Sequence, residues 1–243
     1  MSKNGILLGT VALGTAALVG LGSASAFAAT PGAGTPTLPG IQAKATAAIT
    51  LRVNDLNAAI SKVNGTARVG SSSASLVSYL QADIAPLQAL GTKIAAATTV
   101  AAARADASTI FTSYRVLALV LPAARLAATA DGIDATAIPG LTTFSAKAAS
   151  RVNPSNRATL QPLIDDLNAQ IQSATNGTAG VATTLLGYTP SQWNANHDLL
   201  TASRGSVQAA NGNVTKARDD VQQMRRLLAS VPPAPSTTPT PAA

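Results

Sequence analysis

The sequence contains no cysteine and no glutamate, and it has one histidine, His197. Without cysteine the chain has no disulfide, no thiolate metal site and no cysteine nucleophile. A single histidine excludes a two-histidine metal site within one chain. Aromatic residues make up 3% of the chain and charged residues 11%, whereas ordinary soluble domains have about 25% charged residues. The chain is therefore short of the side chains that most catalytic and metal sites use, and we expect no enzymatic activity and no cofactor.

Small apolar residues take the place of these missing side chains. Hydrophobic residues make up 47% of the 243 residues, and alanine supplies much of that share. Alanine is the best helix former because it has no side-chain entropy to lose. The composition, with few aromatic or β-branched clusters, predicts an all-α fold.

The chain is basic, but its charges are scattered. The formal net charge is +7, and it becomes +6, from 16 bases and 10 acids, once Lys3 leaves with the N-terminal segment described below. The bases are spread singly except for the neighbours Arg225 and Arg226. A scattered excess attracts anionic polymers weakly. It lacks the basic stripe that is typical of a nucleic-acid groove, so we expect no nucleic-acid partner.

Residues 1–28 have the three parts of a secretory signal. Lys3 and the α-amine are positive, Ile6 to Leu21 is apolar and uncharged, and Ala26-Phe27-Ala28 is a small-residue cleavage site. We expect export to the cell envelope or beyond it, with cleavage after Ala28; retention as an uncleaved N-terminal anchor is the alternative. The most apolar run elsewhere, Val116 to Ala124, is too short to cross a bilayer, so we expect no membrane span after cleavage.

Proline-rich segments flank the middle of the chain. TPGAGTPTLPG precedes it and VPPAPSTTPTPAA follows it. Such compositions are typical of extended or disordered linkers. The predicted organisation is a signal peptide (1–28), a linker (29–40), a helical bundle (41–230) and a disordered tail (231–243).

Between these segments the apolar residues recur every three or four positions, as they do on one face of a helix. This spacing predicts long helices packed side by side in an elongated, antiparallel, coiled-coil-like bundle. The same apolar stripes would serve equally well within one chain and between chains, so the oligomeric state stays open. The five stretches with this spacing begin near Ile49, Leu80, Ile110, Leu160 and Val207.

Glycine and proline mark the predicted ends of these helices. Pro86 predicts a kink, and the run from Asp131-Gly132 to Pro139-Gly140 predicts the end of the third helix. At Gly187 to Pro190, glycine ends one helix, Thr189 caps the next, and proline takes its first turn. From there the last helix is predicted to run to about Ala229.

Parts of the sequence occur twice. DLNAAISKVNGTARV, from Asp55 to Val69, is closely matched by DLNAQIQSATNGTAGV, from Asp166 to Val181. Two shorter matches follow in the same order, LVSY with LLGY and VAAARAD with VTKARDD. The common order and an offset of about 110 residues favour duplication of a helical hairpin; chance similarity between alanine-rich helices is the alternative. The shorter matches begin at Leu76, Leu185, Val100 and Val214.

The candidate contact residues are Trp193, His197, Tyr114 and Arg115. Trp193 and His197 are four positions apart and would share one helix face. They could contact a ligand, although a lone histidine more often makes a structural hydrogen bond. Tyr114 and Arg115 precede the most apolar run and could begin a partner-binding helix if its face is exposed. Burial of that face is the default, because large apolar patches are seldom left in water.

Adjacent acids occur at Asp165-Asp166 and at Asp219-Asp220. Neighbours on a helix do not face each other, so neither pair can share a proton or a metal ion without another helix. We expect solvated or ion-paired acids. Lys216, four residues before Asp220, is one expected partner, and Arg104 and Arg218 could pair with aspartates of a facing helix. The sequence has no phosphate loop, nucleophile elbow or zinc-ligand spacing.

Two segments, IFTSYRVLALVLPAARLAATAD and YTPSQWNANHDLLTASR, begin at Ile110 and Tyr188. They resemble segments of uncharacterised secreted helical proteins of high-GC actinobacteria, and the resemblance covers most of the mature chain. It implies export and an all-α structure. It brings no catalytic or binding residue, because that group has no established activity. The chain departs from the group at Leu117, where an aromatic residue often follows the Arg-Val pair.

Together these features favour an exported, non-enzymatic helical-bundle protein that acts as a structural or interaction module in the cell envelope or outside it. Its partner would be another protein or an anionic cell-wall polymer. The alternative is a binding module for an anionic cell-wall polymer or a small ligand, which would use arginines and lysines along the helices together with Trp193 and His197.

Overall fold

The computed structural model describes residues 36–66, 70 and 72–230, and this part of the chain is helical and contains no strand. The predicted all-α class is confirmed. The predicted signal peptide and tail lie outside the described residues. The first helix, α1 (Leu38–Asn64), begins three residues before the predicted start of the bundle. Thr37 caps it by accepting a hydrogen bond from the Gly40 amide at 3.3 Å.

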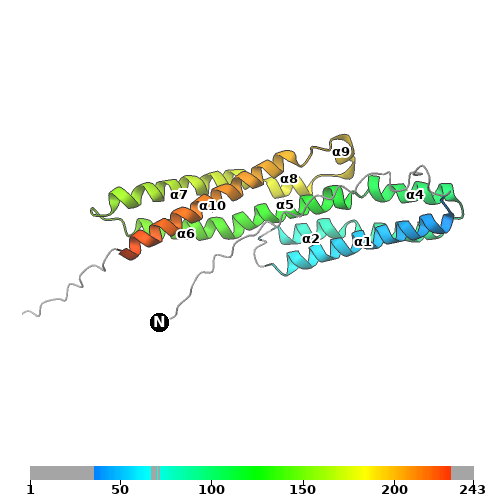
Figure 1. Ribbon diagram of the computed structural model, residues 1–243, viewed down its shortest axis with the longest axis horizontal. Coiled ribbons are helices and arrows are strands. Elements are labelled where there is room, and N and C mark those ends of the chain that lie inside the picture. The colour runs from blue at the N-terminus through cyan, green and yellow to red at the C-terminus, as the bar shows by residue number, and fades with distance from the viewer. Residues whose placement is uncertain (1–35, 67–69, 71, 231–243) are drawn as a thin grey trace, which may run out of the picture.

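The helices form two bundles that lie end to end, which gives the molecule its elongated shape (Figure 1). In the first bundle α1 packs against α2, α3 and α4, and in the second α7 packs against α10 and α6. Two short helices, α8 and α9, follow α7 and precede α10 in the sequence, and α8 packs against α5. The remaining bounds are α2 (Ser73–Gln81), α3 (Ile84–Ala95), α4 (Val100–Thr112), α5 (Leu121–Gly132), α6 (Ile138–Ala149), α7 (Arg157–Thr178), α8 (Val181–Leu186), α9 (Pro190–Ala195) and α10 (Thr201–Ser230).

One helical stretch, from Val116 to Ala149, joins the two bundles. It contains α5, α6 and two π-helical segments, η2 (Val116–Val120) and η3 (Ile133–Ala137). The predicted helix end between Asp131 and Gly140 is therefore wrong.

Each π segment lies directly before a proline of this long helix. The amides of Leu121 and Ile138, the residues before Pro122 and Pro139, donate to carbonyls five residues earlier. A proline in an α-helix removes one amide donor, and its ring clashes with the carbonyl four residues before it. The wider π turn changes the hydrogen-bond register at this point. The two π segments thus let the helix continue through both prolines.

The core consists of two clusters, one in each bundle. Leu56, Leu76 and Leu119 are fully buried in the first cluster, and Leu167 and Met224 are fully buried in the second. Helix α10 contributes to both clusters, because Val207 belongs to the first and Val214 to the second. The bundles are therefore connected by α10 as well as by the long α5–α6 helix.

Several predicted breaks are confirmed, and one predicted rod is shorter than expected. Gly187 follows α8, and Thr189 begins α9 with a reciprocal capping box that includes Gln192. The predicted helix from Pro190 to Ala229 is interrupted after α9, where the Asn196 Oδ1 accepts a hydrogen bond from the Asp198 amide at 2.9 Å. An asparagine that bonds the backbone two residues ahead favours a turn over a helix. Near Pro86, where a kink is predicted, the helix is instead interrupted between α2 and α3.

The two copies of the repeated segment lie on α1 and α7, and the chain continues differently after each of them. In the first copy α1 ends at Asn64, Gly65 follows as its C-cap, and the next helix, α2, packs back against α1. The second lies at the end of α7, where Gly180 has a φ of +69° and the chain continues into α8 (Figure 1). The long neighbour of α7 is α10. The two copies therefore do not form the same local hairpin.

The joined helices include an apolar stretch that the sequence analysis did not anticipate. Within Val100–Ala149, an 18-residue window has a mean hydropathy of 1.6, so it is long and apolar enough to cross a membrane by length and composition. Other parts of the fold bury 56% of that window. Val116, Leu119 and Leu121 lie in the first core. This burial favours a core helix, and it confirms the default expected for the apolar run after Tyr114 and Arg115.

Candidate functional site

The structure brings Arg115 together with the residues around Trp193. Arg115 lies at the break between α4 and η2 in the left-handed conformation, with a φ of +48°. Its Nε donates to the Asn194 Oδ1 at 2.7 Å, and the Asn194 Nδ2 donates to the carbonyl of Thr112 at 2.9 Å. These two bonds fasten α9 to the end of α4. Tyr114 and Trp193 are half-buried against the first core.

Trp193 and His197 are in contact, but not because they share a helix face. Their rings meet edge to face, with centroids 5.8 Å apart. Helix α9 ends at Ala195, so His197 lies in the following turn and is exposed. The expected helical relationship is wrong, and the ring contact arises from the turn. The pair forms a small aromatic surface beside the α4–η2 break.

The capping box of α9 holds this aromatic surface in place. The Thr189 side chain accepts from the Gln192 amide at 3.3 Å, and the Gln192 Oε1 accepts from the Thr189 amide at 2.8 Å. We expect Thr189→Ala to lower the free energy of unfolding by about 1 kcal/mol, since the helix loses a cap. Thermal unfolding followed by circular dichroism would measure this change. Thr201→Ala, at an exposed position on α10, is the control. Equal stability of both variants would contradict the capping role.

An acidic residue that the sequence analysis did not select lies beside two tyrosines of the first bundle. Burial raises the pKa of Asp83 from 3.8 to about 6. Burial, and then the charge of Asp83, raises the pKa of Tyr79 to about 12 and also raises the pKa of Tyr114. Within the described residues the buried Tyr79 hydroxyl has no hydrogen-bond partner. The break between α2 and α3 thus buries a carboxyl group that nearby cations do not compensate.

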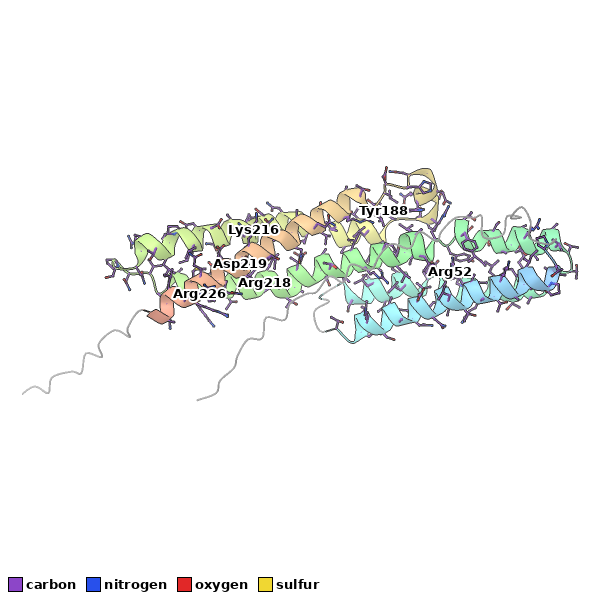
Figure 2. All side chains as sticks on the ribbon, in the orientation of Figure 1. Arg52, Tyr188, Lys216, Arg218, Asp219 and Arg226 are labelled. Atoms are coloured by element: carbon purple, nitrogen blue, oxygen red, sulfur yellow. The ribbon has the colours of Figure 1, made fainter. Side chains whose placement is uncertain are left out.

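A second buried charge, the Arg52 guanidinium, packs against α4. Arg52 of α1 is 5% exposed, and its Nη1 donates to the carbonyl of Ala48 at 2.8 Å. Its guanidinium lies 4.6 Å from the centroid of the Phe111 ring. Burial lowers the pKa of Arg52, while Asp55 acts in the opposite direction. Because the side chain is buried against Phe111, we assign it a structural role; Figure 2 labels Arg52 between α1 and α4.

The acidic pairs meet across two helices in a way that the sequence spacing did not predict. Asp220 of α10 lies next to Asp166 of α7, and burial, followed by the charges of Asp166 and Asp219, raises the pKa of Asp220. The Asp220 Oδ2 is shielded and accepts no hydrogen bond from a nitrogen or hydroxyl of the described residues. The negative charge of Asp166 close by favours the protonated form of the Asp220 carboxyl.

The ion pairs expected around these acids do not form. Within the described ranges one ion pair is present, between the Lys93 Nζ and the Asp106 Oδ1 at 2.7 Å. Lys216 does not pair with Asp220, and the buried Nε atoms of Arg104 and Arg218 have no hydrogen-bond partner there. Figure 2 places Lys216, Arg218 and Asp219 along α10. The expected pairing of Asp220 with Lys216 is wrong, because Asp220 lies next to Asp166 of α7. The other expectation, solvated acids, holds for Asp165, Asp166 and Asp219, which are exposed.

Five exposed bases gather at the free end of the second bundle, where α6 and α10 end and α7 begins (Figure 1). We call this group the basic end. No acid occurs between residues 135 and 164 or between residues 221 and 230. The next acid of α7, Asp165, is eight residues from the helix start, which is about 12 Å along the axis. The basic end consists of Lys147, Arg151, Arg157, Arg225 and Arg226.

An open groove of about 430 Å³ lies within the basic end, between the last turns of α6 and α10. Lys147, Arg151 and Arg225 line it together with the apolar side chains of Phe144 and Leu228. The Arg225 guanidinium lies 5.4 Å from the centroid of the Phe144 ring. The groove therefore combines an apolar floor with cations that have no acidic partner within the described residues.

Apolar periodicity does not predict this groove, but two features of the charge distribution indicate a cluster of bases. Arg225-Arg226 is the one place where bases are adjacent, and the acid-free run from 135 to 164 contains three bases. Their proximity depends on α6 and α10 ending at the same level, which apolar periodicity does not reveal. Tyr114, Arg115, Trp193 and His197 lie elsewhere, along the first core and at the α9 turn.

In the described part of the chain, no group of three or more histidine, cysteine or acidic side chains is arranged to hold a metal ion. Comparison of the chain with protein-family models, with curated proteins and with solved structures gave no match.

Proposed function

We propose that the chain is an exported helical module of the cell envelope that binds an anionic wall polymer at its basic end. The support is the gathering of five exposed bases, without an acid, at one end of an elongated molecule. Clustered charge raises the local concentration of an oppositely charged partner far more than scattered charge does. The secretory features of residues 1–28 and the resemblance to secreted actinobacterial proteins support the extracytoplasmic setting. We assign the module no catalytic role.

Helix ends alone do not account for this many bases. A helix C-terminus carries roughly half a negative charge and favours nearby cations. The two C-termini of α6 and α10 therefore offset only about one of the five positive charges, and the N-terminus of α7 restores about half of one. An excess of about four and a half positive charges is left for a partner.

The wall-polymer proposal can be tested by sedimentation with purified cell wall. The five bases of the basic end are replaced by glutamine, and binding is expected to weaken at least tenfold, because the variant loses its clustered charge. Binding of the unchanged protein is expected to fall steeply as NaCl is raised from low to near-molar concentration. Wall stripped of its phosphate polymer with hydrofluoric acid should bind poorly.

A matched variant controls for total charge. Five exposed bases outside the basic end are replaced by glutamine, and this variant is expected to bind within about twofold of the unchanged protein, apart from a small loss of long-range attraction. Equal losses in the two variants, or binding that survives near-molar salt, would contradict the proposal. The control positions are Lys44, Lys62, Arg125, Arg204 and Lys216.

A second candidate function is the recognition of another protein at the α9 turn. The observation that favours it is the exposed His197 ring against Trp193, beside the hydrogen bonds that fix α9. Aromatic side chains on rigid supports are common contact residues of protein interfaces. His197→Ala should leave wall sedimentation unchanged. If instead His197→Ala weakens wall sedimentation while the basic-end variant does not, the α9 turn and not the basic end is the surface that contacts the wall.

We further infer that the two halves of the chain derive from one ancestral helical unit with coiled-coil-like packing. The matched positions are equally buried: Leu56 and Leu167, Leu76 and Leu185, and Ala103 and Ala217 are all 0% exposed. Each matched helix therefore turns the same residues toward its core. The different connections after the two NGTA segments, from α1 to α2 and from α7 to α8, then arose after the duplication.

A further inference from the structure

The groove in the basic end has two kinds of surface, and a hydrophilic polymer would use only one of them. Ala148 forms a buried part of its floor, and Phe144 and Leu228 are half-buried there. Exposed cations lie around this floor. Small-molecule sites commonly have volumes of about 300–1,000 Å³, apolar walls and a few polar groups, and a groove of about 430 Å³ falls in that range.

We propose that this groove binds a single-chain anionic amphiphile, taken up as a free molecule from water. The acidic headgroup, a phosphate or a carboxylate, contacts Lys147, Arg151 and Arg225. The chain lies on Phe144 and Leu228. This inference goes beyond the proposed function: it uses cations of the same basic end, but it does not require that a wall polymer binds there.

Charge and apolar area together favour this ligand class. An arginine can donate two parallel hydrogen bonds to a phosphate or carboxylate, and within the described residues no acid pairs with Arg151 or Arg225. Each methylene that moves from water onto an apolar surface favours binding. An acidic peptide would satisfy the cations but would leave the apolar floor uncovered. A flat membrane surface would contact the rim more than the floor of a groove.

Isothermal titration calorimetry with three probes separates these contributions. The probes are decyl phosphate below its micelle concentration, inorganic phosphate, and decyl glucoside. We expect decyl phosphate to bind at least tenfold more tightly than either of the others, because only it carries both the charge and the chain. Equal binding of inorganic phosphate would overturn the role of the chain, and equal binding of decyl glucoside would overturn the role of the charge.

Three variants locate the binding to the groove. Replacing Lys147, Arg151 and Arg225 by glutamine should weaken decyl phosphate binding at least tenfold, whereas replacing Lys44, Lys62 and Lys216 should not change it by more than twofold. Ala229→Glu, at an exposed position that lines the groove, places a negative charge there and should weaken binding at least fivefold. Circular dichroism verifies that all variants stay helical.

Leu228→Asn distinguishes this inference from the polymer proposal. It should weaken decyl phosphate binding at least fivefold and leave wall sedimentation unchanged, because the charges stay in place. If decyl phosphate fails to bind while wall sedimentation still depends on the basic end, only the amphiphile inference is wrong. If decyl phosphate binds as expected while wall sedimentation is independent of the basic end, only the polymer proposal is wrong. Binding to anionic vesicles that Leu228→Asn and Ala229→Glu do not affect would overturn the groove as the site.

Discussion

Leu56→Ala and Leu167→Ala should each lower the free energy of unfolding by about 2–5 kcal/mol, the range found when a buried leucine is truncated to alanine. Both side chains are 0% exposed, one in each core cluster. Each truncation removes apolar contacts and leaves a cavity that helices fixed on both sides cannot fully close. Denaturant unfolding followed by circular dichroism measures the change.

Helix α1 supplies a matched control for this pair. Leu51 is 53% exposed on the same helix as Leu56, so Leu51→Ala should change stability by no more than about 0.5 kcal/mol. Trp193 packs against the first core, and its fluorescence therefore reports on the first bundle. We expect Leu56→Ala to shift the fluorescence transition more than Leu167→Ala does. Equal shifts would show that the two bundles unfold as one unit, and a shift from Leu51→Ala as large as that from Leu56→Ala would contradict the assigned core.

Apolar periodicity predicted which faces of the helices are buried, but not where every helix ends. The stripe through Leu160, Leu167 and Met224 is buried as expected. Pro139 predicts the end of a helix, because proline disfavours a helix interior. The structure keeps the helix by means of a π segment that ends two residues before the proline, and the preference of proline against helix interiors does not predict this. The break at Asn196 is a local effect that its side chain explains.

The candidate site was less accessible to sequence reasoning than the fold. Trp193 and His197 are in contact because they are close in the chain, although the helix face that they were predicted to share does not form. Asp166 and Asp220 meet, and Lys147 and Arg225 line the same groove, because helices far apart in sequence are placed in one register. Sequence spacing within one helix cannot supply that register. Charge distribution could have indicated the basic end, since a run without acids is visible in the sequence.

Asp83→Asn should stabilise the protein at neutral pH by about 1–2 kcal/mol. Burial raises the pKa of Asp83 from 3.8 to about 6, which means that the folded protein disfavours the charged carboxylate. A difference of about two pKa units corresponds to roughly 3 kcal/mol. The side chain is partly exposed, and solvent screening reduces this value. Asparagine keeps the shape of the side chain and removes the charge.

The pH dependence gives this prediction its direction. Below about pH 3 the carboxyl is protonated in both the folded and the unfolded chain, and it imposes no penalty. Between about pH 4 and pH 6 the unfolded chain ionises first, so the unfolded state binds fewer protons and stability falls as pH rises. Above about pH 6 both states are ionised and the penalty is constant. The advantage of Asp83→Asn should therefore be near zero at about pH 3, still small at about pH 4 and complete by about pH 7.

Urea unfolding of both proteins at several pH values measures this difference. Asp198→Asn, at an exposed position, serves as the control and should change stability by less than about 0.5 kcal/mol throughout this range. An advantage of Asp83→Asn that is as large at pH 4 as at pH 7 would mean that the gain comes from packing or capping. In that case the buried carboxylate beside Tyr79 and Tyr114 would not be the source of strain in the first bundle.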